Sequence, residues 1–274
     1  MRTFSLLFLM LILSCITVAQ VKKEWFPSEL NIKPFEANML EPKAGFSLMS
    51  DHRLRLDIST SQDFYKSGND NSAFSFGGDL FTFTRLRSES GFKFPVEAID
   101  YLFGFNTGYK VFHQDDEYGY RLRLSHISAH FVDGKYDSKT QSWSNGDSSR
   151  VYSREFLEFI TYSRYKGCRI YGGLTYLFHV APKNIGKGIY QLGFDYYMNW
   201  MYSGIFVPYI AYDFKLSKVN TYVGNNIFTA GIKFGKAFGK GISVAYSYFS
   251  GLSVQGEYYD RRESYSAIGI NLGF

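Results

Sequence analysis

From residue 44 onward, apolar and polar residues alternate along most of the chain. The last segment is the clearest case: Ile268, Ile270, Leu272 and Phe274 are separated by small or polar residues. Successive side chains of a β-strand point to opposite faces of the sheet, so this period of two predicts strands with one apolar face. Turn residues separate the segments, and antiparallel pairing of neighbours follows.

The alternating segments predict about twelve strands, with ten or fourteen as alternatives. The third and fourth segments could merge or shift, because the sequence 103–106 between them is a weak turn. An apolar stripe on every strand favours a closed sheet that faces lipid. The predicted fold is all-β, a single antiparallel transmembrane β-barrel over residues 44–274. The segments are 44–59, 73–87, 91–102, 105–113, 117–132, 151–165, 168–180, 187–200, 204–216, 222–236, 240–251 and 262–274.

The connections between the segments support a membrane barrel over a soluble sandwich. Membrane barrels have short periplasmic turns and longer external loops. If the first strand runs outward, long polar connections at 60–72, 133–150 and 252–261 fall outside. Short connections then fall on the periplasmic side; these are 88–90, 114–116, 166–167, 201–203 and 237–239.

The N-terminus has the sequence features of an export signal. Arg2 precedes a short apolar run, and Ala19 ends a small-x-small exit, which predicts a signal peptide over 1–19. A lipoprotein signal ending at Cys15 is the alternative. Residues 20–43 are irregular and hold three prolines, so we expect a periplasmic N-terminal segment there.

Composition agrees with a barrel: the chain has 23 Tyr and 27 Phe, and after signal cleavage Cys168 would be its sole cysteine. The net charge of +5 is spread along the chain, so no nucleic-acid-binding stripe is expected. No zinc, calcium or phosphate-binding motif occurs, so no cofactor or metal is expected.

The segment 117–132 carries the residues most suggestive of chemistry. Its alternation places Leu122, Leu124, His126, Ser128 and His130 on one face, and Arg121 with Arg123 on the other. An arginine facing the middle of the bilayer costs about 2–4 kcal/mol, so the arginines should face the lumen. His126 and Ser128 would then lie on the outer wall near the external rim.

Glu155 begins the antiparallel neighbour and could approach His126 there. A serine, a histidine and a carboxylate can form an activated nucleophile. The hypothesis has Ser128 as nucleophile, His126 as base and Glu155 as the group that orients the histidine, with His130 and Asp133 as supporting candidates. The rival interpretation is a polar girdle in contact with lipid headgroups.

The lumen suggests further alternatives. Arg121, Arg123 and Arg169 should point inward, either as a salt network or as the lining of a narrow pore. A partner-binding role for the loop 133–150 is a third hypothesis. His126 and His130 are about 13 Å apart on a strand, too far to share one metal ion.

These motifs resemble a family of bacterial outer-membrane proteins, domain-of-unknown-function family 1207. Its signature is similar to the run from Ser125 to Gly134, where His126, Ser128, His130 and Asp133 match and Ala129 and Gly134 depart from it. The stretch from Arg150 to Glu155 and the segment from Ile170 to Gly173, followed by His179 and Pro182, also fit.

The resemblance implies an outer-membrane barrel and no assigned activity. Separately, the motif His126-x-Ser128 is similar to the His-x-Ser motif of the outer-membrane lipid A deacylases, whose site also lies on the outer wall of a barrel. This similarity covers two residues and concerns the site alone. We therefore expect an integral protein of a Gram-negative outer membrane that acts on or among envelope lipids, with a lipid esterase or a narrow pore as alternatives. Expected partners are outer-membrane lipid, lipopolysaccharide and the barrel-insertion machinery, which would read Phe274.

Overall fold

The computed structural model describes residues 21–41 and 43–273. The predicted signal peptide, its alternative at Cys15 and the terminal Phe274 therefore lie outside the described residues. No helix among those residues is long and apolar enough to cross a membrane.

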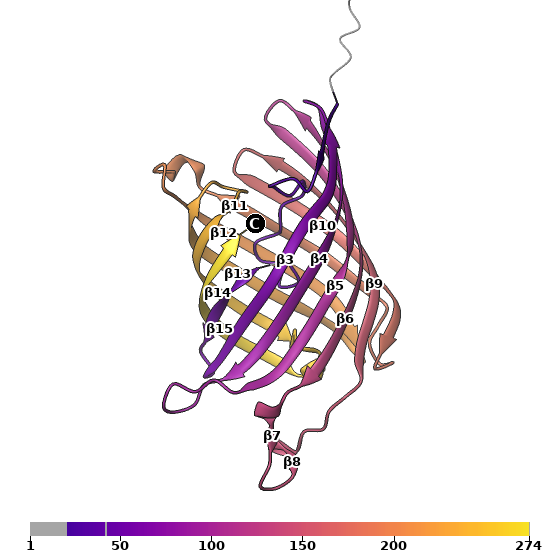
Figure 1. The fold of residues 1–274 in the computed structure, drawn as a ribbon, viewed down its shortest axis with the longest axis vertical. Helices are drawn as coiled ribbons and strands as arrows, with labels where there is room; N and C mark the ends of the chain where they lie inside the picture. Colours follow the sequence, from indigo (N-terminus) through magenta and orange to yellow (C-terminus); the bar gives the residue numbers. More distant parts are fainter. Residues whose placement is uncertain (1–20, 42, 274) are drawn as a thin grey trace, which may run out of the picture.

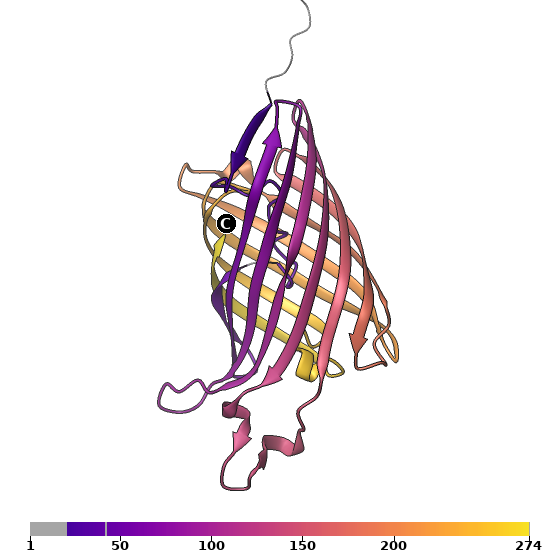
Figure 2. The ribbon, with the colours of Figure 1, turned by 45° about the vertical axis from the view of Figure 1, so that its right-hand side comes forward.

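The predicted all-β barrel is confirmed, with twelve antiparallel strands in a closed ring (Figures 1 and 2). The ring closes because β2 pairs with β15 on one side and with β3 on the other. Its strands are β2 (Ala44–Met49), β3 (Arg53–Gly68), β4 (Ser72–Arg87), β5 (Val96–His113), β6 (Asp116–Phe131), β9 (Tyr152–Tyr165), β10 (Cys168–Ala181), β11 (Gly188–Tyr197), β12 (Phe206–Val219), β13 (Thr221–Gly235), β14 (Gly241–Leu252) and β15 (Arg262–Gly273).

Two strand predictions were wrong, and their effects on the strand count cancel. The segment 44–59 is a hairpin, in which Leu48 pairs with Leu54 across a turn that His52 closes with a positive φ of 61°. The apolar residues stay at even-numbered positions on both sides of this turn, so the alternation alone does not reveal the turn. The segments 91–102 and 105–113 are instead one strand, β5, because Gly104 packs closely against Leu124 and Ser125 and makes no turn.

These changes reassign two connections. The turn at 69–71 lies at the periplasmic end, where 60–72 was predicted to be an external loop, and residues 60–68 belong to β3. The connection at 88–95 lies at the external end, where 88–90 was predicted to be periplasmic. The long segment between β6 and β9 is external, as expected, and contains the short pair β7 (Tyr136–Asp137) and β8 (Ser142–Trp143).

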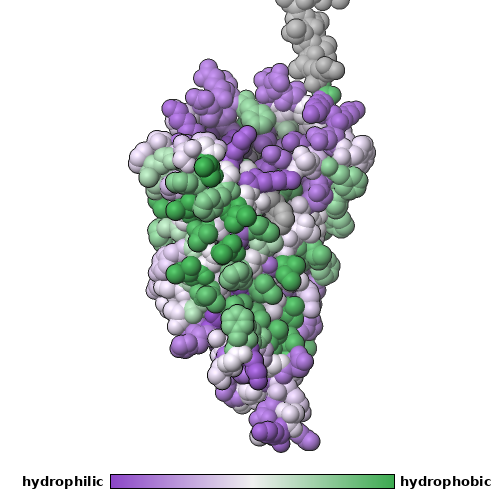
Figure 3. Space-filling view, turned by 60° about the vertical axis from the view of Figure 1, so that its left-hand side comes forward, coloured by the Kyte–Doolittle hydropathy of each residue, from purple (hydrophilic) through white to green (hydrophobic). Residues whose placement is uncertain are grey.

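The outer wall is apolar around the middle of the barrel. Figure 3 shows a broad hydrophobic band between two hydrophilic ends. Exposed large apolar side chains occupy alternate positions of the strands, as with Leu122 and Leu124 on β6. This band is the surface that meets lipid, since about 25 Å of apolar wall is typical of outer-membrane barrels.

The N-terminal segment lies largely inside the barrel, whereas 20–43 was predicted to lie in the periplasm. Residues 22–25 form β1 (Lys22–Trp25), which extends the sheet beside β3. The following residues enter the lumen, where Phe35, Asn38 and Glu41 are buried. The physical reason is charge: the lumen contains buried arginines that need acceptors, and this segment supplies Glu41 and backbone carbonyls.

The connection between β14 and β15 folds into the external mouth. Its short 3-10 helix η4 (Gly256–Tyr258) is buried, and the Gly256 N–H donates a 2.7 Å hydrogen bond to Asp100 Oδ2. Tyr258 packs beneath the guanidinium groups of Arg85 and Arg261. Both ends of the lumen are therefore partly filled by the chain itself.

Candidate functional site

Strand β6 presents His126 and Ser128 on the outer wall. Its burial alternates along its length, with Arg121, Arg123 and Ser125 buried toward the lumen and Leu122 and Leu124 exposed to the outside. His126 and Ser128 continue the outer row and are half-buried. They lie toward the external end of the strand, because β6 begins at the periplasmic turn 114–115.

Strand β9 brings Glu155 beside His126. The two residues are directly paired in the antiparallel β6–β9 ladder, so their side chains leave the same face at the same height. His126 Nδ1 lies 2.6 Å from Glu155 Oε1. A histidine held through Nδ1 by a carboxylate has its other ring nitrogen free for a substrate or a hydroxyl.

Strand β10 supplies a second histidine that the sequence analysis did not place in the site. His179 Nδ1 is hydrogen-bonded to Glu155 Oε2, so the carboxylate lies between two imidazoles on neighbouring strands. A β-bulge between Leu177 and His179 shifts the register and brings His179 opposite Glu155. His179 is the more exposed of the two histidines, with 64% of its side-chain surface accessible.

Two serines face each other beside this row. Ser128 and Ser153 are paired residues in the β6–β9 ladder, one step closer to the external rim. Ser153 Oγ donates a 3.0 Å hydrogen bond to Glu155 Oε1. Within the described part of the chain, Ser128 has no side-chain hydrogen bond, to His126 or to any other group.

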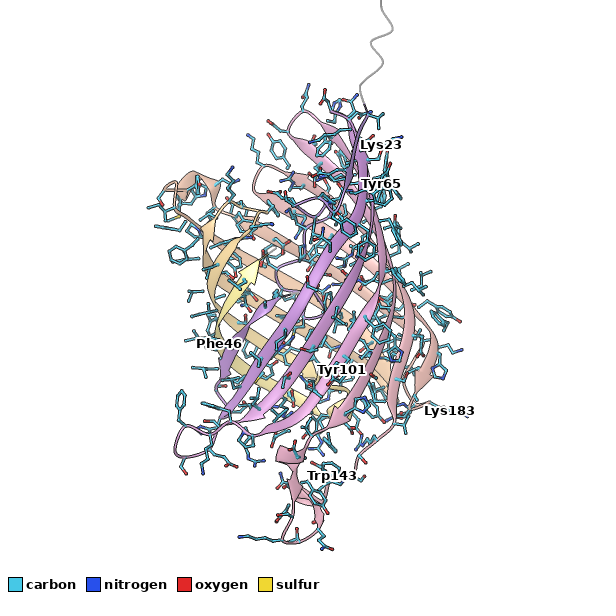
Figure 4. The ribbon with its side chains drawn as sticks, in the orientation of Figure 1. Lys23, Phe46, Tyr65, Tyr101, Trp143 and Lys183 are labelled. Carbon is cyan, nitrogen blue, oxygen red and sulfur yellow. The ribbon has the colours of Figure 1, made fainter. Side chains whose placement is uncertain are left out.

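Aromatic side chains border the site on β5. The ring of Phe103 lies 5.0 Å from that of His126, and Tyr101 is the ladder partner of Ser128. Figure 4 shows Tyr101 on the wall of β5, toward the end of the barrel that carries Trp143. The site is therefore a polar row next to apolar surface that faces the bilayer.

The structure does not bring the two supporting candidates into this cluster. His130 is exposed near the end of β6, with its ring 6.1 Å from that of Tyr101. Asp133 lies in the exposed start of η1 (Asp133–Lys135). In the described ranges, neither residue has a hydrogen bond or ion pair with Ser128, His126 or Glu155.

The lumen arginines form ion pairs. Arg121 donates a 2.8 Å hydrogen bond to Glu41, and Arg123 donates another of the same length to that carboxylate. Glu158 contacts both guanidinium groups. Arg169 pairs with Asp195 and also donates to the Lys33 and Pro34 carbonyls. These charges are neutralised by the chain, so this region of the lumen resembles a packed salt network.

No group of three His, Cys, Asp or Glu side chains within 21–41 and 43–273 is arranged to hold a metal ion. The chemistry available at the outer wall is that of a hydroxyl, an imidazole and a carboxylate.

The family described as "Protein of unknown function (DUF1207)" matches residues 98–274, well over half of the chain. The chain belongs to this family. The match extends from β5 to the C-terminus and includes His126, Ser128, Glu155 and His179. The family resemblance inferred from sequence is therefore confirmed. The comparison with curated proteins finds no matching sequence.

Two solved structures show a similar fold. Outer membrane phospholipase A from Escherichia coli is 13% identical, with a TM-score of 0.54 over 89% of this chain and 94% of that one. The Salmonella typhi outer membrane phospholipase, a dimer with bound calcium, is 12% identical, with a TM-score of 0.53 over 86% and 94%. At such identity the likeness shows the fold alone. The protein is an outer-membrane β-barrel, and this is its location.

Proposed function

We propose that this protein is an outer-membrane lipid esterase that hydrolyses an acyl ester of lipid A or a phospholipid. The observation that carries the proposal is the 2.6 Å contact between His126 and Glu155 on the lipid-facing wall, with Ser128 two residues along on the same face. Similarity in fold to proteins named outer membrane phospholipase supports the same substrate class.

In this proposal each residue has a defined role. Ser128 Oγ attacks the ester carbonyl carbon, and His126 Nε2 takes the hydroxyl proton. Glu155 accepts the Nδ1–H of His126, which orients the ring and stabilises its positive charge. His126 then returns the proton to the alcohol as it leaves, and water repeats the sequence to release a fatty acid and regenerate Ser128.

The hydrogen bond between Ser128 and His126 would form when substrate binds. Catalytic hydrogen bonds are often long or poorly aligned without substrate and tighten in the complex. The wall position suits a lipid substrate, because an acyl chain lying against Phe103 reaches the serine without leaving the bilayer.

The proposal also includes the route to the membrane. We infer that the signal peptide over residues 1–19 directs export and that the insertion machinery reads Phe274. Outer-membrane lipid and lipopolysaccharide are the proposed partners of the mature protein.

The test compares three variants, Ser128→Ala, His126→Ala and Glu155→Gln, with the control Ser264→Ala. Ser264 is an exposed serine on β15, hydrogen-bonded to Tyr248 instead of to the histidine row. Purified proteins are incubated with phospholipid and lipid A in mixed micelles, and released fatty acid is measured. Release by wild type and Ser264→Ala, with loss in Ser128→Ala at unchanged barrel melting, is expected. Equal release by Ser128→Ala and wild type, or none by wild type, contradicts the proposal.

A further inference from the structure

A pocket lies in the external half of the lumen, on the opposite face of the barrel wall from the serine-histidine row. It has about 780 Å³ of empty space, including the part open to solvent. Its walls come from Met39 and Leu40 of the N-terminal segment, strands β9 and β11–β14, and the loops that follow β10 and β14. Ligand sites are typically concave and lined mostly by apolar side chains, with a small number of polar groups that orient the ligand.

Most of the pocket wall is apolar. Ile189, Ile227 and Phe249 project into it from three strands, and Leu252 and Val254 line it near the external mouth. This wall suits the alkyl part of a ligand, since removing apolar surface from water is favourable.

Arg154 is the unusual polar residue of the pocket. Its guanidinium lies 4.9 Å from the Tyr152 ring, and its buried Nε has no hydrogen-bond partner. In the residues that the structure describes, Arg154 forms no ion pair and contacts the Tyr152 side chain, whereas Arg121, Arg123 and Arg169 each bind a carboxylate. A planar guanidinium can bind an acceptor with two oxygens through paired hydrogen bonds.

The remaining charged groups favour an anion. Lys215 lines the pocket and donates a 2.6 Å hydrogen bond to Asn38, and Lys218 lies at its rim. The carboxylate in the wall is Asp213; its Oδ2 accepts from Tyr171 and Gln191, while its Oδ1 has no partner. The lining thus has three cations and one carboxylate.

We propose that this pocket binds an amphipathic carboxylate, with its two oxygens on Arg154 and its alkyl tail against Ile189, Ile227 and Phe249. The site is independent of the proposed esterase, because Arg154 points into the lumen while Ser153 and Glu155 on either side of it point outward. Ligand enters from the external side, between the β10–β11 and β14–β15 loops.

The test uses octanoate as the probe and the Ser128→Ala protein in lipid nanodiscs, so that turnover cannot contribute. Isothermal titration calorimetry, with empty nanodiscs as the blank, should show saturable binding of one octanoate. Arg154→Gln should weaken binding at least tenfold, since a charged bidentate contact is lost. Lys139→Gln, a change in the exposed connection between β7 and β8, should leave it unchanged. Octyltrimethylammonium, with the same tail and the opposite charge, should not bind.

A second variant guards against a folding defect in Arg154→Gln. Ile189→Trp keeps the guanidinium and fills the apolar part of the pocket, so it too should abolish saturable octanoate binding. Heat identical to that of empty nanodiscs, or equal binding by wild type, Arg154→Gln and Ile189→Trp, overturns the proposal. Binding of octyltrimethylammonium as tight as that of octanoate would also overturn it, because the anion preference would be absent.

Discussion

Ser128 and Ser153 face each other across the β6–β9 ladder, and Ser153 donates a 3.0 Å hydrogen bond to Glu155. The two hydroxyls therefore have different surroundings, although they share a face and a height on the wall. Ser153 is hydrogen-bonded to a carboxylate, whereas Ser128 lies two residues from an imidazole on the same face, and an imidazole is the most frequent general base for a serine hydroxyl.

Ser153→Ala should reduce the proposed esterase activity without abolishing it. It removes one hydrogen bond to Glu155, worth about 0.5–1.5 kcal/mol, so kcat/KM should fall by about two- to tenfold. Initial rates of fatty-acid release at several lipid mole fractions measure this ratio. If Ser153→Ala loses all release while Ser128→Ala retains it, Ser153 is the nucleophile and the proposed roles are reversed.

Glu41→Gln should destabilise the barrel by about 3–5 kcal/mol, because it leaves Arg121 and Arg123 buried with Glu158 as their shared carboxylate. The free energy of unfolding in urea, with the protein in detergent micelles, measures the loss. Glu29→Gln is the control. Glu29 is exposed and pairs with Lys33, so its loss should cost about 0–1 kcal/mol.

The same carboxylate predicts a dependence of stability on pH. Burial raises the pKa of Glu41, but Arg121 and Arg123 outweigh burial and hold this pKa at about 2, below the ordinary 4.5. A group with a lowered folded pKa stabilises the fold above its ordinary pKa and loses that contribution as the pH falls through the folded value. Unfolding free energies should therefore decline between pH 4.5 and 2. Glu41→Gln should flatten that decline, and an unchanged slope would contradict this account.

Asp147→Asn should loosen the external loop between β6 and β9. Asp147 binds Lys135 at 2.9 Å and also Arg261, so it ties this loop to the β14–β15 loop. Burial raises the pKa of Asp147, and the two cations lower it further than burial raises it. The tie is thus present above the ordinary pKa and lost as the pH falls through the lowered value.

Hydrogen exchange of the amides in residues 134–148, corrected for the intrinsic rate at each pH, measures this effect. Wild type should lose protection in acid, and Asp147→Asn should lack it already at pH 7. Asp133→Asn, in the same loop and exposed, is the matched control. Equal protection in all three proteins at pH 7 would show that the ion pairs of Asp147 do not protect this loop from exchange.

Deletion of residues 21–41 should open the lumen to ions. This segment places Phe35, Asn38 and Glu41 among the buried side chains of the barrel. Single-channel recording in planar bilayers should show little conductance for wild type and a larger conductance for the deletion. Heat-modifiable migration in gels verifies that the deletion folds. A wild-type conductance equal to that of the deletion would favour the pore hypothesis.

The architecture could be predicted because a membrane barrel repeats its pattern in every strand. Apolar residues at alternate positions identify the wall wherever the strand continues, as along β6. The pattern does not locate a tight turn that preserves parity, as at Ser50–His52, nor does it distinguish a glycine used for close packing, such as Gly104, from a turn glycine. The predicted strand boundaries therefore depended on the identity of turn residues, which do not mark every turn and also occur inside strands.

The proximity of His126 and Glu155 could be anticipated because antiparallel neighbours place the end of one strand beside the start of the next. The same reasoning applies to Glu155 and His179, but the β-bulge before His179 alters the register, and single residues do not reveal it. The pairing of Glu41 with Arg121 spans 80 positions in the chain. Local sequence does not show which distant acid will neutralise a lumen arginine.

The wall that carries His126 and Ser128 is one strand thick, with the bilayer directly against it. A reaction on such a face meets its substrate as a neighbour in a two-dimensional fluid, where surface density replaces molarity as the controlling variable. Diluting the lipid with an inert detergent, at constant bulk concentration, would then slow turnover as effectively as removing substrate. For the proposed esterase, the composition and packing of the surrounding leaflet would thus become part of the kinetics.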